Sequence, residues 1–119
     1  MGWAILNLVA MIVGSVLVFL GGLFDLIAAI GVNRFPDLYT RLHAVTIGTI
    51  GGAVYPIIGS TLLISSLNMP IAMKLSFILP MILTAALILV TAPTGSHIIA
   101  RAAFRSGLKP YTVEGDEEC

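Results

Sequence analysis

Charge is the scarcest property of this sequence. Only 10% of its 119 residues are Asp, Glu, Lys or Arg, whereas about a quarter of the residues in soluble domains are charged. No charged residue precedes Asp25, and none lies between His43 and Lys74. A water-soluble domain of this size cannot cover its surface with so few charges, so we exclude a soluble globular protein.

Other absences limit the chemistry of the chain. The one cysteine, Cys119, is the last residue and cannot form an internal disulfide. A formal net charge of zero gives no phosphate-binding patch, so nucleic acid is not an expected partner. The sequence has no glycine-rich phosphate loop, no activated nucleophile and no histidine–carboxylate pair at ligand spacing. We therefore expect no catalytic residues, no metal and no cofactor.

What is present is a set of long apolar runs, which make up most of the 58% hydrophobic content. About 20 helical residues cross the hydrocarbon layer of a bilayer. The runs predict an all-α membrane protein with three transmembrane helices over residues 3–32, 43–66 and 71–92. Pro93 and Gly95 should end the third helix, after which residues 96–106 should form a short amphipathic helix at the membrane surface. These segments make one domain, 1–106, followed by a polar C-terminal tail, 107–119.

Small residues and prolines mark two further features of the spans. Small residues let helices approach closely in lipid, and the candidate packing positions are Gly21, Gly22, Ala44, Gly48 and Gly52. Prolines remove a helical hydrogen bond and predict kinks at Pro56, Pro80 and Pro93. For Pro56, a static packing bend is favoured over a gate.

The segment between the first two spans holds two arginines, an aspartate and a histidine, although charge is scarce on both sides of it. This corner motif runs from Arg34 to Ala44 and includes Arg34, Pro36, Asp37, Arg41 and His43. Pro36 should end the first helix and allow a second to begin, with Asp37 and Arg41 four residues apart on one face. The motif is interpreted as a topological anchor, with a direct part in ion entry as the alternative.

Asp25 and His43 are the candidates for an ion or proton pathway. Asp25 lies nine residues before Arg34, which places it roughly 13 Å further along a helix. Acids at such depth face protein or water and often mark ion pathways. The favoured interpretation is that Asp25 sits near the headgroups, or stays protonated and makes a packing hydrogen bond to a neighbouring helix; direct participation in ion or proton movement is the alternative.

The basic residues predict the topology. Arg34, Arg41, Arg101, Arg105 and Lys109 share one side of a three-span protein, and only Lys74 is on the other. The positive-inside rule places the N-terminus outside and the C-terminus in the cytoplasm of a multi-pass protein of the cell membrane.

Three spans with a single acid and no basic residue at the same depth are a poor pathway for ions. We therefore expect a subunit that packs against other membrane subunits and the lipid bilayer. A self-assembling, holin-like pore is a more distant alternative.

The residues that carry a family resemblance are the corner motif from Arg34 to Ala44, Gly22-Leu23-Phe24 before it, and Thr91-Ala92-Pro93 through Ala100-Arg101-Ala102-Ala103 after it. Over roughly residues 15 to 105 the chain resembles the MrpG-type subunits of the Mrp-type multisubunit cation/proton antiporters. The resemblance implies a small protein without activity of its own, in an assembly that exchanges monovalent cations, chiefly sodium, for protons. It also implies an alternative host, a redox-driven complex of the membrane-bound hydrogenase type with an Mrp-like antiporter module.

One departure from the family's pattern lies just after the motif. Many members have an Ala-Ala-Thr-Lys run after the histidine, where this chain has Ala44-Val45-Thr46-Ile47. Any role of that lysine in moving ions or protons is not transferred to this chain.

Overall fold

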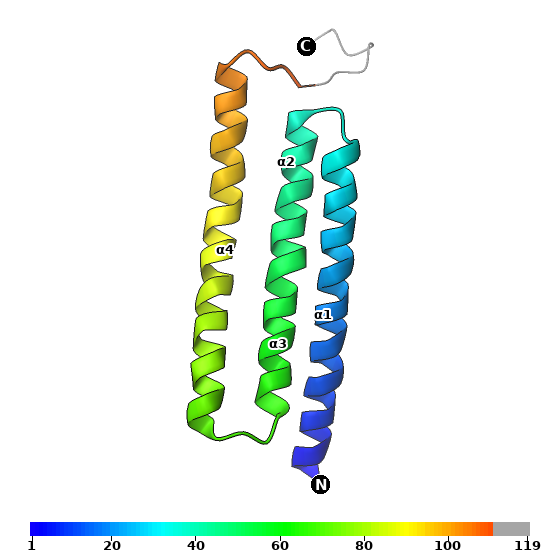
Figure 1. Ribbon diagram of the computed structural model, residues 1–119, viewed down its shortest axis with the longest axis vertical. Helices are drawn as coiled ribbons and strands as arrows, with labels where there is room; N and C mark the ends of the chain where they lie inside the picture. Colours follow the sequence, from blue (N-terminus) through cyan, green and yellow to red (C-terminus); the bar gives the residue numbers. More distant parts are fainter. Residues whose placement is uncertain (111–119) are drawn as a thin grey trace.

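A computed structural model describes residues 1–110 as a set of long helices without strands (Figure 1). The helices are α1 (Gly2–Arg34), α2 (Leu38–Ile47), the π-helical segment η1 (Gly48–Val54), α3 (Tyr55–Ser66) and α4 (Ile71–Arg105). The segments α2, η1 and α3 follow one another without interruption, so three helices are long and apolar enough to cross a membrane. The all-α fold with three spans is confirmed.

The corner between α1 and α2 forms where the sequence predicts it. Phe35 ends α1 with an extended backbone (φ −72°, ψ 134°), and its N–H donates to the carbonyl of Gly31 at 2.9 Å. A proline disfavours the α-helical conformation in the residue before it, which accounts for the extended Phe35. Asp37 then occupies the N-cap position of α2, so the second helix begins at Leu38, before the predicted span.

The structure corrects the prediction of a separate interfacial helix over 96–106. Residues 96–105 continue α4, which passes through both Pro80 and Pro93 without ending. Each proline removes only one backbone hydrogen bond, a loss that membrane helices tolerate. At 35 residues, α4 is about 52 Å long and exceeds the hydrocarbon layer of roughly 30 Å. Its last turns, with Arg101 and Arg105, therefore extend beyond the apolar span.

The backbone around Pro56 departs from the α-helix in an unpredicted way. The seven residues before Tyr55 form the π-helical segment η1, and Pro56 follows in the first turn of α3. π-Helical turns are rare in proteins, and those that occur often lie at functional sites. Three of the seven residues, Gly48, Gly51 and Gly52, are glycines that face α1.

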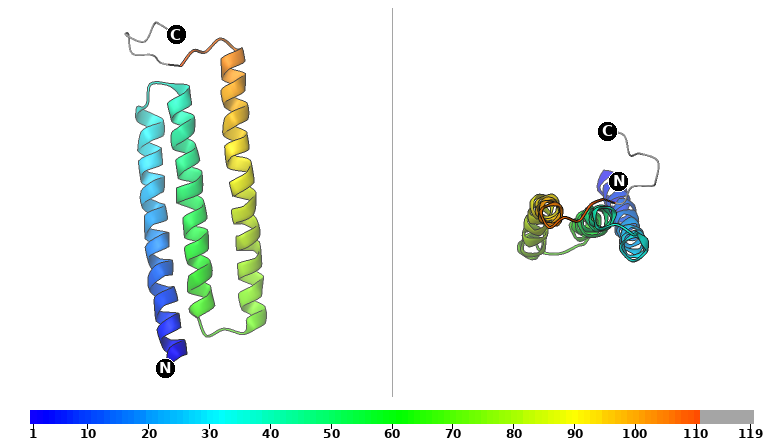
Figure 2. Two further views of the ribbon diagram at one scale, coloured as in Figure 1. Left: turned by 180° about the vertical axis from the view of Figure 1, so that it is seen from behind. Right: turned by 90° about the horizontal axis from the view of Figure 1, so that it is seen from above.

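The three spans lie side by side in a single layer (Figure 2). The α2–η1–α3 span lies in the middle, with α1 on one side and α4 on the other, and within the described residues no Cα atom of α1 lies within 8 Å of one of α4. The buried apolar residues are few and mostly small: Ala28, Ala44, Val54, Ala85 and Ala103. Within residues 1–110 no large side chain is fully buried, so this part of the chain has no closed core of its own.

Candidate functional site on the membrane-embedded helices

Asp25 of α1 lies against the glycines of η1. Its carboxylate occupies the space that a Cβ on Gly52 would fill, and a Cβ on Gly48 would stand 3.8 Å from its Oδ1. One turn further along α1, Ala28 packs on Gly48. The missing side chains at positions 48 and 52 are therefore what allows an acid to sit between the two spans.

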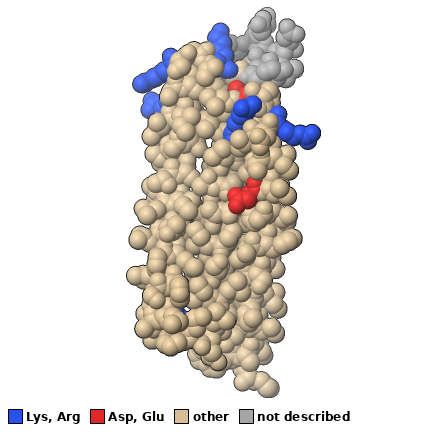
Figure 3. Space-filling view, viewed as in Figure 1, with Lys and Arg blue, Asp and Glu red and all other residues tan. Residues whose placement is uncertain are grey.

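This carboxylate is exposed on the surface of the layer. Within residues 1–110, none of the side-chain hydrogen bonds involves Asp25, and no basic side chain pairs with it. Most of the basic residues gather at one end of the molecule, and acidic atoms appear both there and further down, within the uncharged surface (Figure 3). A charge at the bilayer centre costs about 2.5–3.5 kcal/mol on insertion scales, so an acid that lies within the hydrocarbon needs a partner or a polar cavity.

His43 lines a different feature, a groove of about 330 Å³ between α1 and the middle span. The residues of the groove are Phe24, His43, Thr46, Ile47, Ile50, Gly51 and Tyr55. Phe24 and Tyr55 form its aromatic end, with ring centroids 5.6 Å apart and ring planes 76° apart. Asp25 is not among the lining residues, so the two candidate pathway residues do not share this groove.

A pair of hydroxyls near His43 links the middle span to α4. Thr46 Oγ1 and Ser96 Oγ are 2.8 Å apart, and Thr46 Oγ1 also lies 2.9 Å from the carbonyl of Leu42, to which it donates. Sequence reasoning missed this pair, since a hydroxyl in a span usually bonds to its own helix, as Thr49 and Thr94 do here. The register between α2 and α4 is what brings Thr46 and Ser96 together.

At the corner, the side chains bond to the backbone and not to one another. Arg41 Nε donates to the carbonyl of Phe35 at 2.7 Å, and Asp37 makes no capping bond through its side chain. Tyr39 donates its hydroxyl to the carbonyl of Leu108 at 3.0 Å, which ties the start of α2 to the segment after α4. A groove of about 370 Å³ lies beside Arg41, lined by Pro36, Asp37, Leu38, Arg41, Leu108 and Lys109.

The five predicted packing residues have different surroundings. Gly21, Ala44, Gly48 and Gly52 face the neighbouring span: Gly21 lies against Pro56, and Ala44 against Gly31. Gly22 is exposed, and a Cβ added to it would have no neighbour within 4 Å in the described part of this chain. Gly22 is therefore open to contact from outside the chain.

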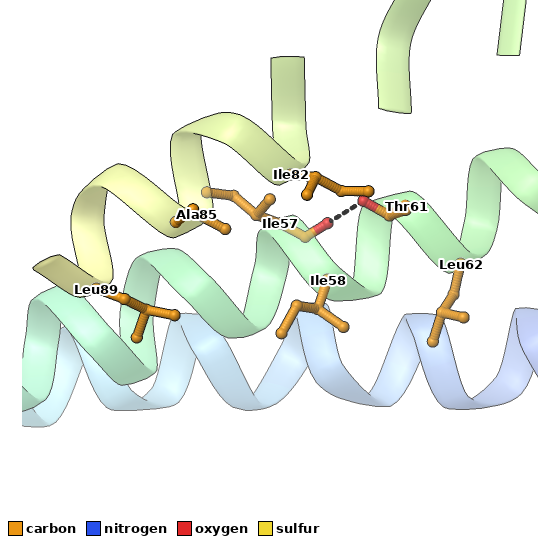
Figure 4. Close-up of a pocket in the computed structure, with 8 residues that line it drawn as sticks. Ile57, Ile58, Thr61, Leu62, Ile82, Ala85 and Leu89 are labelled. Atoms are coloured by element: carbon orange, nitrogen blue, oxygen red, sulfur yellow. Dashed lines mark hydrogen bonds between the residues drawn. The ribbon is translucent and has the colours of Figure 1, made fainter. Parts of the chain in front are cut away.

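An apolar groove of about 400 Å³ separates α3 from α4 (Figure 4). It is lined by Ile57, Ile58, Thr61, Leu62, Ile82, Ala85, Ala86 and Leu89. Its one hydroxyl, on Thr61, donates to the carbonyl of Ile57 at 2.9 Å. The groove therefore provides apolar contact area, and its lining residues include no charged or catalytic side chain.

No metal-binding cluster is found in the part of the chain that the structure describes: residues 1–110 contain no group of three or more His, Cys, Asp or Glu side chains placed to hold a metal ion.

Lys74 lies at the opposite end from the corner motif, where its Nζ donates to the carbonyl of Ser65 at 2.8 Å.

The sequence is similar to a known protein family and to several known proteins. The sequence model of a family described as "Na+/H+ antiporter subunit" (PhaG, MnhG, YufB) matches residues 17–104. The UPF0091 protein PH0944 of Pyrococcus horikoshii is 35% identical over 105 residues, 88% of this chain and 87% of that protein. The G-type Na(+)/H(+) antiporter subunit of Alkalihalophilus pseudofirmus is 30% identical over 82% of this chain and 76% of that protein. Several staphylococcal relatives are longer, and the chain spans 58–68% of their length.

Two solved complexes contain chains of similar structure. A chain of the Mrp complex from Dietzia sp. matches with a TM-score of 0.74 and 34% identity, over 95% of both chains. A chain of the membrane-bound sulfane sulfur reductase, an archaeal respiratory membrane complex, matches with a TM-score of 0.72 and 30% identity, over 90% of this chain and 92% of that one. Both similar chains are parts of larger membrane assemblies.

Proposed function

Because the chain belongs to the PhaG/MnhG/YufB family of Na+/H+ antiporter subunits, we propose that it is a non-catalytic subunit of an Mrp-type assembly. This assembly exchanges monovalent cations, chiefly Na+, for protons. The chain contributes helices, an intramembrane acid and a basic cytoplasmic corner, and it depends on other membrane subunits for a complete pathway.

The observation that carries this proposal is the single layer of helices. A path for ions needs polar groups on several sides and walls that separate it from lipid. Here α1 and α4 do not meet, so the three spans enclose nothing between them. The surface of the layer is covered by exposed large apolar residues such as Leu26, Ile82 and Val90. Such a layer suits packing against other helices better than conduction by itself.

Within the assembly, Asp25 and His43 are the proposed contributions to an ion or proton pathway. They lie in different places, Asp25 beside Gly52 and His43 in the groove with Tyr55. Each therefore serves the pathway together with groups from other subunits. Arg34, Pro36, Asp37, Arg41 and His43 form the anchor that holds the corner at the cytoplasmic surface, with the N-terminus outside and the C-terminus inside.

Purification through an affinity tag on this chain tests the proposal. In a mild detergent the chain should bring several different membrane proteins with it. The purified assembly in liposomes should couple Na+ to proton movement, and the isolated chain should not. Exchange of sodium for protons by the isolated chain would contradict the proposal.

A second host for the same chain is a redox-driven complex with an Mrp-like module. The similarity to a chain of an archaeal respiratory membrane complex supports this candidate. Metal analysis of the purified assembly distinguishes the two hosts, since a redox complex would contain iron–sulfur or nickel sites. The comparisons favour either host over a self-assembling pore.

A further inference from the structure

We infer that the surface around Asp25 on α1 receives a helix from a neighbouring subunit, and that this helix brings a basic side chain to the Asp25 carboxylate. The inference rests on the proposed function, because it requires an assembly of different subunits. It adds the contact face of this chain and the chemistry of the partner.

The charge of Asp25 is the first observation. The carboxylate is exposed, and within residues 1–110 it has no salt bridge. The nearest basic residue along α1 is Arg34, nine positions away, and the nearest before Gly48 on the facing span is Arg41, seven positions away. Acids at bilayer depth pair with other groups or face water-filled cavities. Because neither basic residue lies near Asp25 along the two spans, a basic partner would come from another subunit.

The backbone of η1 blocks one side of the Asp25 carboxylate. Gly52 lies directly behind it, with the position of a Cβ on Gly52 only 2.9 Å from Oδ2, and Gly48 lies one turn away. The carboxylate cannot move toward η1, because the backbone already occupies that space. A partner can reach it from the open surface of the layer.

The neighbours of Asp25 on α1 are suited to the close approach of another helix. Gly22 lies three residues before Asp25 and Ala29 four residues after it, so the three residues share one face. Both small residues are exposed, and a Cβ on Gly22 would touch nothing in the described part of this chain. Small residues at such positions let helix backbones approach closely in membranes. The face Gly22–Asp25–Ala29 thus combines room for a helix with a charge that needs a cation.

Charge complementarity selects the partner. A lysine ammonium or an arginine guanidinium at the same depth would form an ion pair with the carboxylate, and this pair would stabilise both charges. Lipid tails cannot form hydrogen bonds or ion pairs with a carboxylate, so the remaining alternative is a hydrated cavity. Thiol labelling of a cysteine at position 25 distinguishes such a cavity from a docked helix.

The test uses the intact assembly with an affinity tag on a neighbouring subunit, in two variants of this chain. Asp25→Asn removes the charge at nearly constant shape, and Gly22→Leu blocks the approach of a helix while leaving Asp25 in place. In mild detergent both variants should remain in the assembly. In a harsher detergent the amount retained should fall at least fivefold for each. Gly95→Leu is the matched control, because a Cβ on Gly95 also meets nothing within 4 Å in the described part of this chain; its retention should equal that of the wild type.

The partner is then identified by neutralising, one at a time, each Lys and Arg within the apolar spans of the co-purifying subunits. One such change should reproduce the fivefold fall, and combining it with Asp25→Asn should cause no further fall. Retention of Asp25→Asn at the wild-type level, or the absence of any coupled basic residue, would overturn the inference.

Access of water to position 25 provides an independent measurement. In the Cys119→Ser background, Asp25→Cys in the intact assembly should resist a charged, water-soluble thiol reagent. Rapid labelling would indicate a hydrated cavity and would overturn the docked helix while leaving the subunit role intact. Purification of the wild-type chain without any other subunit in mild detergent would instead refute the proposed function.

Discussion

Gly14 of α1 and Gly59 of α3 face each other so closely that a Cβ on either would approach the carbonyl oxygen of the other. The distances would be 2.7 Å from Gly14 to the Gly59 oxygen and 2.6 Å from Gly59 to the Gly14 oxygen. Because a backbone oxygen cannot move aside as a side chain can, any larger residue at these positions must separate the two helices. This contact joins the two spans in the half of the molecule that is opposite the corner motif.

Gly59→Ala should therefore destabilise the packing of α1 on α3. Overpacking costs typically about 1–3 kcal/mol, and we expect a loss of this size in the free energy of unfolding. Unfolding in mixed detergent micelles would measure it. Gly95→Ala is the control, since its Cβ would point into open space; an equal loss in both variants would show that the Gly14–Gly59 contact is not responsible.

Asp25→Asn should lower Na+-dependent proton movement in assemblies purified in mild detergent and reconstituted into vesicles. The expected reduction is about tenfold or more, equivalent to about 1.4 kcal/mol, because the variant removes the one acid within the apolar helices of the described part of this chain. Asp37→Asn makes the same chemical change outside the membrane and should leave transport near the wild-type level. Unchanged transport in Asp25→Asn would remove this residue from the mechanism.

The hydrogen bond between Thr46 and Ser96 should couple the middle span to α4. Interhelical hydrogen bonds in membranes contribute about 0.6–2 kcal/mol. A double-mutant cycle with Thr46→Val and Ser96→Ala should recover a coupling energy in this range. Thr94→Val with Ser96→Ala should show none, because Thr94 bonds to its own helix, at the carbonyl of Val90.

Tyr39→Phe should loosen the segment that follows α4. The variant removes the hydrogen bond to the Leu108 carbonyl, which contributes about 0.5–1.5 kcal/mol. Limited proteolysis should cut after Leu108 faster in the variant than in the wild type. The helices should remain intact, so circular dichroism should show the same helical content; a change there would point to wider unfolding.

Thiol labelling of intact cells should reveal the orientation. In the Cys119→Ser background, a membrane-impermeant reagent should label Asn68→Cys directly and Ser106→Cys only after the cells are permeabilised. The expectation follows from the basic residues at the end that holds the corner motif. The reverse pattern would place the C-terminus outside.

Several features were determined by the sequence alone, because they depend on local chemistry. The scarcity of charge required membrane spans, and Pro36 set the end of α1 by restricting Phe35. The corner motif was specific enough to indicate the family. The acidic part of the predicted tail lies outside the described residues.

Local reasoning failed around two of the prolines, Pro93 and Pro56. Pro93 was expected to end the third helix, yet α4 continues to Arg105, because a single lost hydrogen bond does not outweigh the remaining bonds of a long helix in an apolar environment. Nothing in the sequence indicated the π-helical turns of η1 before Pro56.

Only the tertiary structure decided which residues meet. Gly21 and Gly22 are adjacent in sequence, but one lies against Pro56 and the other is exposed, because successive helical residues point in directions about 100° apart. The contact between Asp25 and Gly52 and the hydrogen bond between Thr46 and Ser96 depend on how the spans are rotated and shifted relative to one another. Those rotations are set by close packing between whole helix faces, which no single stretch of sequence contains.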